Sequence, residues 1–261
     1  MEHRTYNNIS YSKVGSGPHL CFLHGFCENA EIWDTLIAEL SASYTCISID
    51  LPGFGKSGGV RFGSMPEEAQ RIHALLTQED ALHTTLFGHS MGGYLLAEYL
   101  AQYGDSMQAA AFIHSTAYGD TKTKKINRQK TIDFIRKHGA DEFFRLFVPS
   151  LVAIEHLGTL RDSLTQMVTQ TKTQSILDGL QAMMQRPNHV PSLGKFEKPV
   201  LFLRGEQDKH YSPYDNYKEA SECHIAQVSV IKSVGHLSMY EDAPAVLKVV
   251  NSFLQFVEQC K

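Results

Sequence analysis

Residues 84–93 read TTLFGHSMGG, a short apolar run that passes into a glycine-rich segment around one serine. The run is β-rich and continuous, which predicts a buried strand. Apolar residues then recur on one side of a helical pattern that Gly104 should stop. Ser90 therefore lies in G-x-S-x-G between a strand and a helix. Glycines are needed there because a side chain at either flanking position would clash in so sharp a turn.

Short apolar runs of the same kind recur along the chain and predict further buried strands. They lie at 19–23, 44–49, 109–113, 200–203 and 227–231. Helical patterns separate most of them, for example at 66–82 and 243–259. Strands that alternate with helices predict an α/β fold with a mostly parallel, doubly wound sheet. Two more short runs, at 5–8 and 9–14, predict an antiparallel edge.

Two glycine-containing segments lie upstream of Ser90. His24-Gly25-Phe26 follows the apolar run at 19–23, and residues 50–57 read DLPGFGKS. Together with GHSMG, these motifs resemble those of the α/β-hydrolase fold family, and the resemblance extends over nearly the whole chain. It implies that the Phe26 and Met91 backbone N–H groups form an oxyanion hole. It also implies a structural role for His24 in holding the loop.

The family resemblance further implies a nucleophile, an acid and a histidine in that chain order. The matching positions are Ser90, then Asp208 three residues after Gly205, then His236 in Val-Gly-His. Each follows a predicted strand, and open α/β sheets gather their sites at the carboxyl ends of strands. Glu206 and Asp215 are rival acids, but the G-x-x-D spacing of the family that the chain resembles selects Asp208. In this arrangement His236 takes the Ser90 proton while Asp208 orients the imidazole.

A long polar and helical segment without a predicted strand interrupts this alternation. We interpret 117–188 as an inserted helical cap on a core formed by 1–116 and 189–261. Residues 117–190 carry a net charge of +4, against −8 for the rest. Phe143, Phe144, Phe147, Met183 and Met184 are candidate wall residues that would contact substrate, and plain packing within the cap is the alternative. A basic run (Lys122, Lys124, Lys125, Arg128, Lys130) is either a solvated helix face or a surface that steers an anionic substrate or an acidic carrier protein.

The composition restricts the function classes. The chain has 261 residues, a net charge of −4 and five cysteines without a C-x-x-C pair, so a nucleic-acid binder, a disulfide scaffold and a zinc ribbon are not expected. We expect a cytoplasmic protein, because no secretion-type apolar region or membrane span is apparent. The sequence does not predict an oligomeric state. No H-E-x-x-H motif appears and no helix opens after Gly53-x-Gly55, so neither a metal nor a cofactor is expected.

These observations predict a serine hydrolase, with a small carboxylic ester as the first candidate substrate and an acyl-enzyme intermediate. The same site would serve C–C bond hydrolysis of a dienoic ketone, or a thioester or lyase-type reaction, and both stay open. A ligand sensor that turns over slowly is the alternative from another class. Ser90 disfavours the relatives that use an aspartate nucleophile.

Overall fold

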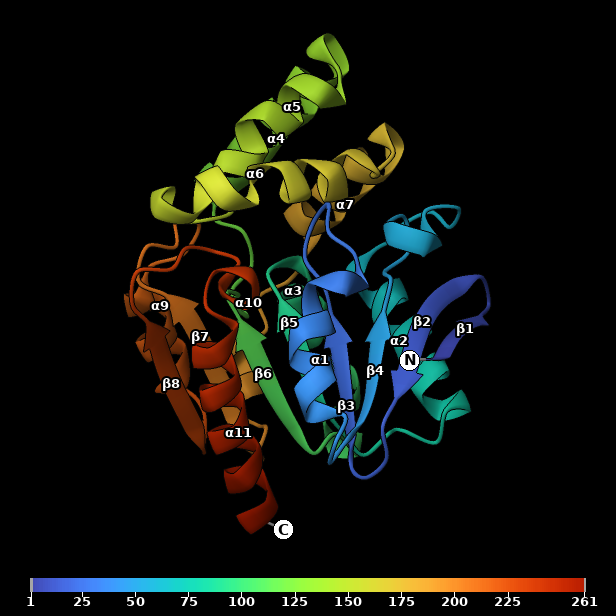
Figure 1. The fold of residues 1–261 in the computed structure, drawn as a ribbon, viewed down its shortest axis with the longest axis vertical. Coiled ribbons are helices and arrows are strands. Elements are labelled where there is room, and N and C mark those ends of the chain that lie inside the picture. Colours follow the sequence, from blue (N-terminus) through green and yellow to red (C-terminus); the bar gives the residue numbers. More distant parts are fainter. Residues whose placement is uncertain (1, 261) are drawn as a thin grey trace.

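The protein forms an eight-stranded sheet in a computed structural model that describes residues 2–260 (Figure 1). The spatial order of the strands is β1-β2-β4-β3-β5-β6-β7-β8. Their bounds are β1 Glu2–Tyr6, β2 Ile9–Val14, β3 His19–Leu23, β4 Thr45–Ile49, β5 Thr84–His89, β6 Ala109–Ile113, β7 Val200–Gly205 and β8 Ala226–Ile231. Each predicted strand matches one of these, but the one predicted at 5–8 lies earlier, at Glu2–Tyr6, because Asn7 and Asn8 adopt left-handed φ values of 49° and 65° and form the turn before β2.

The direction of the strands follows the predicted pattern. All pairs from β4 to β8 are parallel, whereas β1 and β2 form an antiparallel hairpin that continues the sheet beside β4. The predicted fold class and its antiparallel edge are therefore confirmed. Strand order reverses at β3, since β4 pairs on one side of it and β5 on the other. In open α/β sheets this reversal creates a crevice outside the carboxyl ends of the strands.

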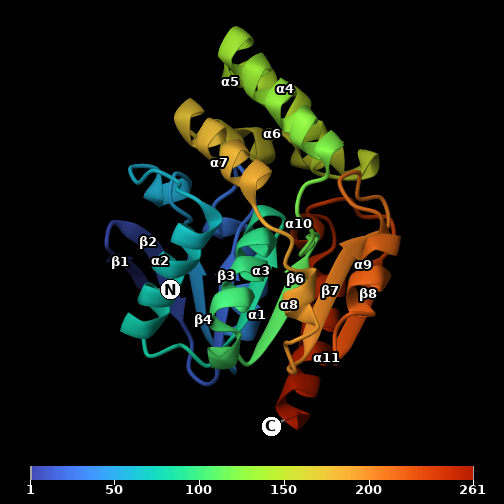
Figure 2. The same ribbon diagram turned by 180° about the vertical axis from the view of Figure 1, so that it is seen from behind.

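Helices cover both faces of the sheet. Helices α1 (Asp34–Leu40) and α11 (Ala243–Gln259) lie on one face (Figure 1), and α2 (Met65–Gln78) and α3 (Met91–Tyr103) lie on the other (Figure 2). Every residue of β4, β5, β6 and β7 is consequently buried. Helix α2 ends four residues earlier than predicted, because Asp80 adopts a left-handed φ of 53° that a helix cannot continue. The remaining short helices are α8 (Val190–Leu193), α9 (Pro213–Ala220) and α10 (Ser238–Glu241).

Four helices lie beyond the carboxyl ends of the strands. They are α4 (Lys122–His138), α5 (Ala140–Phe147), α6 (Ile154–Thr169) and α7 (Thr173–Gln185), and all four project above the sheet in both views (Figures 1 and 2). This placement supports the division into a core and a cap at 117–188, which we keep as a proposal. Across residues 2–260, no helix is both long and apolar enough to cross a membrane.

Candidate active site

Ser90 lies between the last residue of β5 and the first residue of α3. Its φ of 49° and ψ of −113° fall outside the regions that side chains normally favour. The turn is tight, because a Cβ atom on Gly88 would lie 2.5 Å from the Gly92 carbonyl oxygen. Only glycine fits at position 88, which explains why the motif surrounds Ser90 with glycines.

The structure brings the three predicted catalytic side chains together. Ser90 Oγ lies 2.9 Å from His236 Nε2, and His236 Nδ1 lies 2.9 Å from Asp208 Oδ2. Asp208 follows β7 and His236 follows β8, so neighbouring strands deliver the acid and the histidine. The other carboxylate oxygen, Asp208 Oδ1, accepts a hydrogen bond from the His210 N–H at 2.8 Å.

The electrostatics of the site keep the acid charged and the histidine neutral. Burial raises the pKa of Asp208, but His236 and His114 outweigh burial and hold that pKa well below its usual range. Burial lowers the pKa of His236, and the attraction of Asp208 offsets this only in part. Near neutral pH the Nε2 atom of His236 is therefore free to accept a proton from Ser90.

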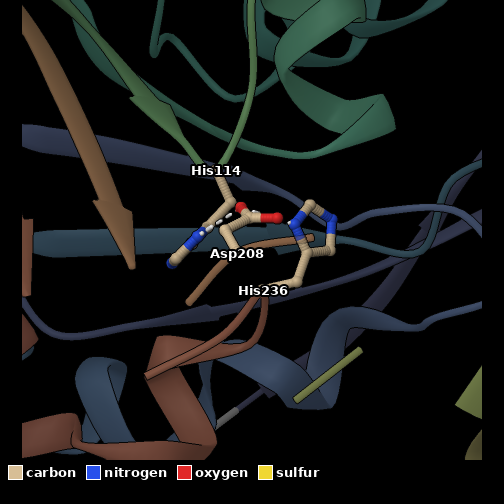
Figure 3. Close-up of side chains that lie close together, drawn as sticks. All are labelled: His114, Asp208 and His236. Atoms are coloured by element: carbon tan, nitrogen blue, oxygen red, sulfur yellow. Dashed lines mark hydrogen bonds and ion pairs between the residues drawn. The ribbon is translucent and has the colours of Figure 1, made fainter. Parts of the chain in front are cut away.

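A second histidine, His114, contacts the same carboxylate from the end of β6 (Figure 3). Its Nδ1–H donates to Asp208 Oδ2 at 3.0 Å, while the Ser238 hydroxyl donates to its Nε2 at 2.7 Å. Ligand atoms of His114, Asp208 and His236 lie within 4.8 Å of one another, as in a metal site. Hydrogen bonds to one shared carboxylate oxygen account for this closeness, and the absence of a metal stays a prediction.

His89 and Glu28 form a buried ion pair next to His236. His89 Nδ1–H donates to Glu28 Oε2 at 2.8 Å, and His89 Nε2–H donates to the His236 carbonyl oxygen at 2.9 Å. Burial lowers the pKa of His89, but Glu28 raises it more, so that pKa lies above its ordinary value. Glu28 Oε2 also accepts from the Gly25 N–H at 2.7 Å. The pair therefore connects the loop after β3 to the loop that carries His236.

The loop after β3 is held in shape by the His24 side chain. His24 Nε2 accepts from the Leu51 N–H at 2.9 Å, and His24 Nδ1–H donates to the Gly25 carbonyl oxygen at 2.7 Å. With both ring nitrogens engaged, His24 holds the shape of the loop. Phe26 lines the cavity beside Ser90, and Met91 begins α3. The oxyanion role of their N–H groups stays a proposal.

A cavity of about 280 Å³ opens above Ser90 and His236. Of the five apolar cap residues expected to contact substrate, Phe143, Phe147 and Met183 line it. Phe144 and Met184 do not line it, and substrate contact by any of the five stays a prediction. Successive helical residues are rotated by about 100° around the helix axis, so Phe143 and Phe147 lie on the same face of α5 and Phe144 lies on another. Phe144 instead borders a hollow beside Arg145, and Met184 packs against the core outside the cavity.

The comparison with known families identifies the fold family. A family model described as alpha/beta hydrolase fold matches residues 18–243. The chain belongs to the alpha/beta hydrolase fold family. The resemblance found in the three sequence motifs is thereby confirmed.

Several members of the alpha/beta hydrolase fold family are similar to this chain. Pimeloyl-(acyl-carrier protein) methyl ester esterase of Citrobacter koseri is 31% identical over 154 residues, which cover 59% of each protein, so the chain matches less than two thirds of that relative. 2-Succinyl-6-hydroxy-2,4-cyclohexadiene-1-carboxylate synthase of Enterobacter sp. is 25% identical over 91% of this chain and 92% of its own length. A thermophilic esterase structure from Thermogutta terrifontis has a TM-score of 0.89 at 23% identity, covering 95% of this chain and 93% of that one.

Sequence reasoning missed three residues of the candidate site of this alpha/beta hydrolase. His89 lies inside the GHSMG motif, where the variable position received no role. His114 directly follows β6, and the rule that selected Asp208 after β7 could have found it. Glu28 carries no sequence signal, because only the folded loop turns its carboxylate toward His89.

Proposed function

We propose that the protein is a serine hydrolase that cleaves small carboxylic esters through an acyl-enzyme. The observation that carries this proposal is the unbroken contact from Ser90 Oγ through His236 to Asp208, beside a cavity. A serine hydroxyl is a weak nucleophile until a base accepts its proton. Here the base is buried, neutral and within hydrogen-bond distance.

In the first half of the reaction Ser90 Oγ attacks the ester carbonyl carbon. The hydroxyl proton passes to His236 Nε2, and the resulting imidazolium is stabilised by Asp208. Negative charge moves onto the carbonyl oxygen, where the Phe26 and Met91 N–H groups donate hydrogen bonds. The C–O bond of the ester then breaks, and His236 returns its proton to the departing alkoxide.

In the second half water replaces the alcohol. His236 Nε2 takes a proton from water, whose oxygen attacks the acyl carbon on Ser90. Collapse of this intermediate breaks the bond to Ser90 Oγ, which recovers its proton from His236. The products are one alcohol and one carboxylic acid, and no cofactor enters either half.

The names of two similar proteins support an ester substrate. The Citrobacter koseri relative is named as a methyl ester esterase and the Thermogutta terrifontis structure as an esterase. We apply these activities to this chain only as support for the proposal, because the first match is partial and the second is distant in sequence.

The direct test is Ser90→Ala. We expect the variant to fold, to lose hydrolysis of short-chain p-nitrophenyl esters by at least 10³-fold, and to escape fluorophosphonate labelling. Ser163→Ala is the matched control, because Ser163 is exposed on α6 and its hydroxyl donates only to the Leu160 carbonyl within its own helix. Undiminished ester turnover by Ser90→Ala would refute the proposal. A single burst of product in the wild type, without turnover, would favour a ligand sensor.

A lyase-type reaction is the second candidate, favoured by the synthase relative that matches over nine-tenths of this chain. Hydrolysis incorporates one oxygen atom from water into the acid product, whereas elimination incorporates none. Turnover in ¹⁸O-labelled water followed by mass spectrometry separates the two reactions. We expect one ¹⁸O atom in the acid, and a product with no label would overturn the hydrolytic assignment.

A further inference from the structure

One wall of the cavity above Ser90 is cationic and hydroxyl-bearing rather than apolar. We call it the cationic wall and define it as Lys124, Arg128, Tyr94 and Tyr211, all of which line the cavity with Ser90 and His236. The lining also holds an apolar group that includes Phe143, Phe147 and Met183, and the first two each contact the Phe26 ring. A cavity lined by both cationic and apolar side chains selects a ligand that has both characters.

Helix α4 supplies the cations through its periodicity. Lys124, Asn127, Arg128 and Thr131 follow one another at helical spacing, and all four line the cavity. Lys122, Lys125 and Lys130 belong to the same basic run and are exposed, as Lys124 is, but they are absent from the lining. The basic run is therefore not a uniform solvated face, because two of its five members reach the cavity above Ser90.

Positive charge on this wall exceeds the negative charge that faces it. Asp120 pairs with Arg128 Nε at 2.6 Å and also with Arg186 Nη1 at 2.8 Å, so one carboxylate serves two guanidinium groups. Over the described part of the chain, Lys124 has no carboxylate partner within ion-pair distance. Glu28, the acidic residue of the lining, is already paired with His89.

The two tyrosines connect this charge to the reacting atoms. Their hydroxyl groups are hydrogen-bonded to each other, and the Tyr211 ring lies 5.9 Å from the His236 ring between centroids. Lys124 Nζ lies 5.0 Å from the Tyr211 ring centre, and the Arg186 guanidinium lies 3.6 Å from that of Tyr94. Lys124, Arg128 and Arg186 thus all lie within 6.0 Å of the centre of one of the two rings. This concentration of positive charge favours an anion.

We propose that the cationic wall binds a carboxylate carried by the acyl part of the ester, so that the preferred substrates are half-esters of small dicarboxylic acids. Lys124 and the terminal nitrogens of Arg128 would donate to the carboxylate, while the apolar side packs the methylene chain. A carboxylate is a small anionic group, which suits a cavity of about 280 Å³ that must also hold the ester. This inference rests on the proposed hydrolase function and specifies its substrate class.

The test compares two methyl esters of equal shape. One is the monomethyl ester of glutarate, and the other replaces the free carboxylate with an isopropyl group. We expect the wild type to show at least a tenfold higher kcat/KM for the charged ester. Lys124→Met should lower that ratio roughly tenfold, as expected for loss of a charge-assisted hydrogen bond. Lys125→Met removes the same charge from an exposed neighbouring position and should leave the ratio unchanged.

A binding measurement separates failure of this inference from failure of the hydrolase proposal. Calorimetry with glutarate alone requires no turnover, and we expect weaker binding in Lys124→Met than in Lys125→Met. If Ser90 is labelled and both esters react equally in all three proteins, the cationic wall does not select carboxylates. If glutarate binds as expected but neither ester reacts and Ser90 resists labelling, the hydrolase proposal fails while the anion site stands.

Discussion

His236 is a buried imidazole between an acid and a serine, and its protonation decides whether it can accept the Ser90 proton. Two environments oppose each other at this ring. Burial disfavours the imidazolium, and Asp208 at 2.9 Å favours it. Burial has the larger effect, so the pKa lies below the ordinary value of 6.5. The enzyme should therefore keep an active base in mildly acidic solution.

This balance predicts the pH profile. Because the neutral form of His236 is the base, kcat/KM for a neutral ester should rise with pH and level off once the pH exceeds the pKa of His236. We expect the midpoint below pH 6.5 and a tenfold loss for each further unit of acidity. Steady-state rates between pH 4.5 and 8 measure this profile. A midpoint above pH 7 would show that the charge of Asp208, rather than burial, controls the ring.

Some residues of the candidate site could be predicted from the sequence because each stands in a local pattern. Ser90 has a strand before it and a helix after it, and Asp208 and His236 each follow an apolar run. His114 was missed because its partner Asp208 is 94 residues away, and only the parallel pairing of β6 and β7 makes them neighbours. The Tyr94–Tyr211 contact spans 117 residues and has no sequence signal at all.

At the scale of elements, the turn between β5 and α3 packs directly against the end of β3. A Cβ atom on Gly92 would lie 2.3 Å from the Leu23 carbonyl oxygen and 2.6 Å from that of His24. Both are backbone atoms, which cannot rotate away as a flexible side chain could. The start of α3 and the predicted oxyanion loop can therefore be adjacent only because position 92 has no side chain.

Gly92→Ala should consequently damage both stability and activity. We expect the free energy of unfolding to fall by about 2 kcal/mol, as for other overpacked sites. The kcat/KM for a neutral ester should fall at least tenfold, because the loop at 24–26 must move. Gly59→Ala is the control, since no atom lies within 4 Å of its added Cβ. Urea denaturation and ester kinetics measure both effects, and a fully active Gly92→Ala would contradict the packing argument.

The helical segment shows where element prediction stops. The composition and periodicity of 117–188 predict helices there. They do not predict how each helix is rotated about its own axis. Phe143 and Phe144 are equally apolar neighbours, and the packing of α5 against α4 and α6 decides which of them reaches the cavity. The same holds for Lys124 and Lys125 on α4. Side-chain direction depends on tertiary contacts that a single sequence does not encode locally.

At the scale of the whole molecule, the junction between the sheet and the helical segment depends on a buried acid. Glu219 lies on α9, and its Oε1 accepts from the Thr116 hydroxyl at 2.7 Å and from the Ala117 N–H at 2.6 Å. Thr116 and Ala117 lie where the chain leaves β6 toward α4. Burial raises the pKa of Glu219 to about 7, although these hydrogen bonds lower it in part.

This acid makes stability depend on pH in a definite direction. Between pH 4.5, the ordinary value for glutamate, and about 7, the folded protein retains a proton on Glu219 that the unfolded chain has released. Stability therefore falls as the pH rises through this window, by at most about 3 kcal/mol for this group.

Glu219→Gln preserves the acceptor for Thr116 and Ala117 and removes the titration, so its loss of stability from pH 5 to pH 8 should be smaller than that of the wild type. Urea denaturation at both pH values measures the difference, and Glu222→Gln, at an exposed position nearby, is the control. Burial also raises the pKa of Glu68 to about 7. Glu68 therefore adds to the pH dependence of stability, but by the same amount in the wild type and in both variants, so it cancels in the comparison. If Glu219→Gln and Glu222→Gln lost the same amount of stability between pH 5 and pH 8, Glu219 would be ionised in the folded protein and its charge would be compensated by Arg204.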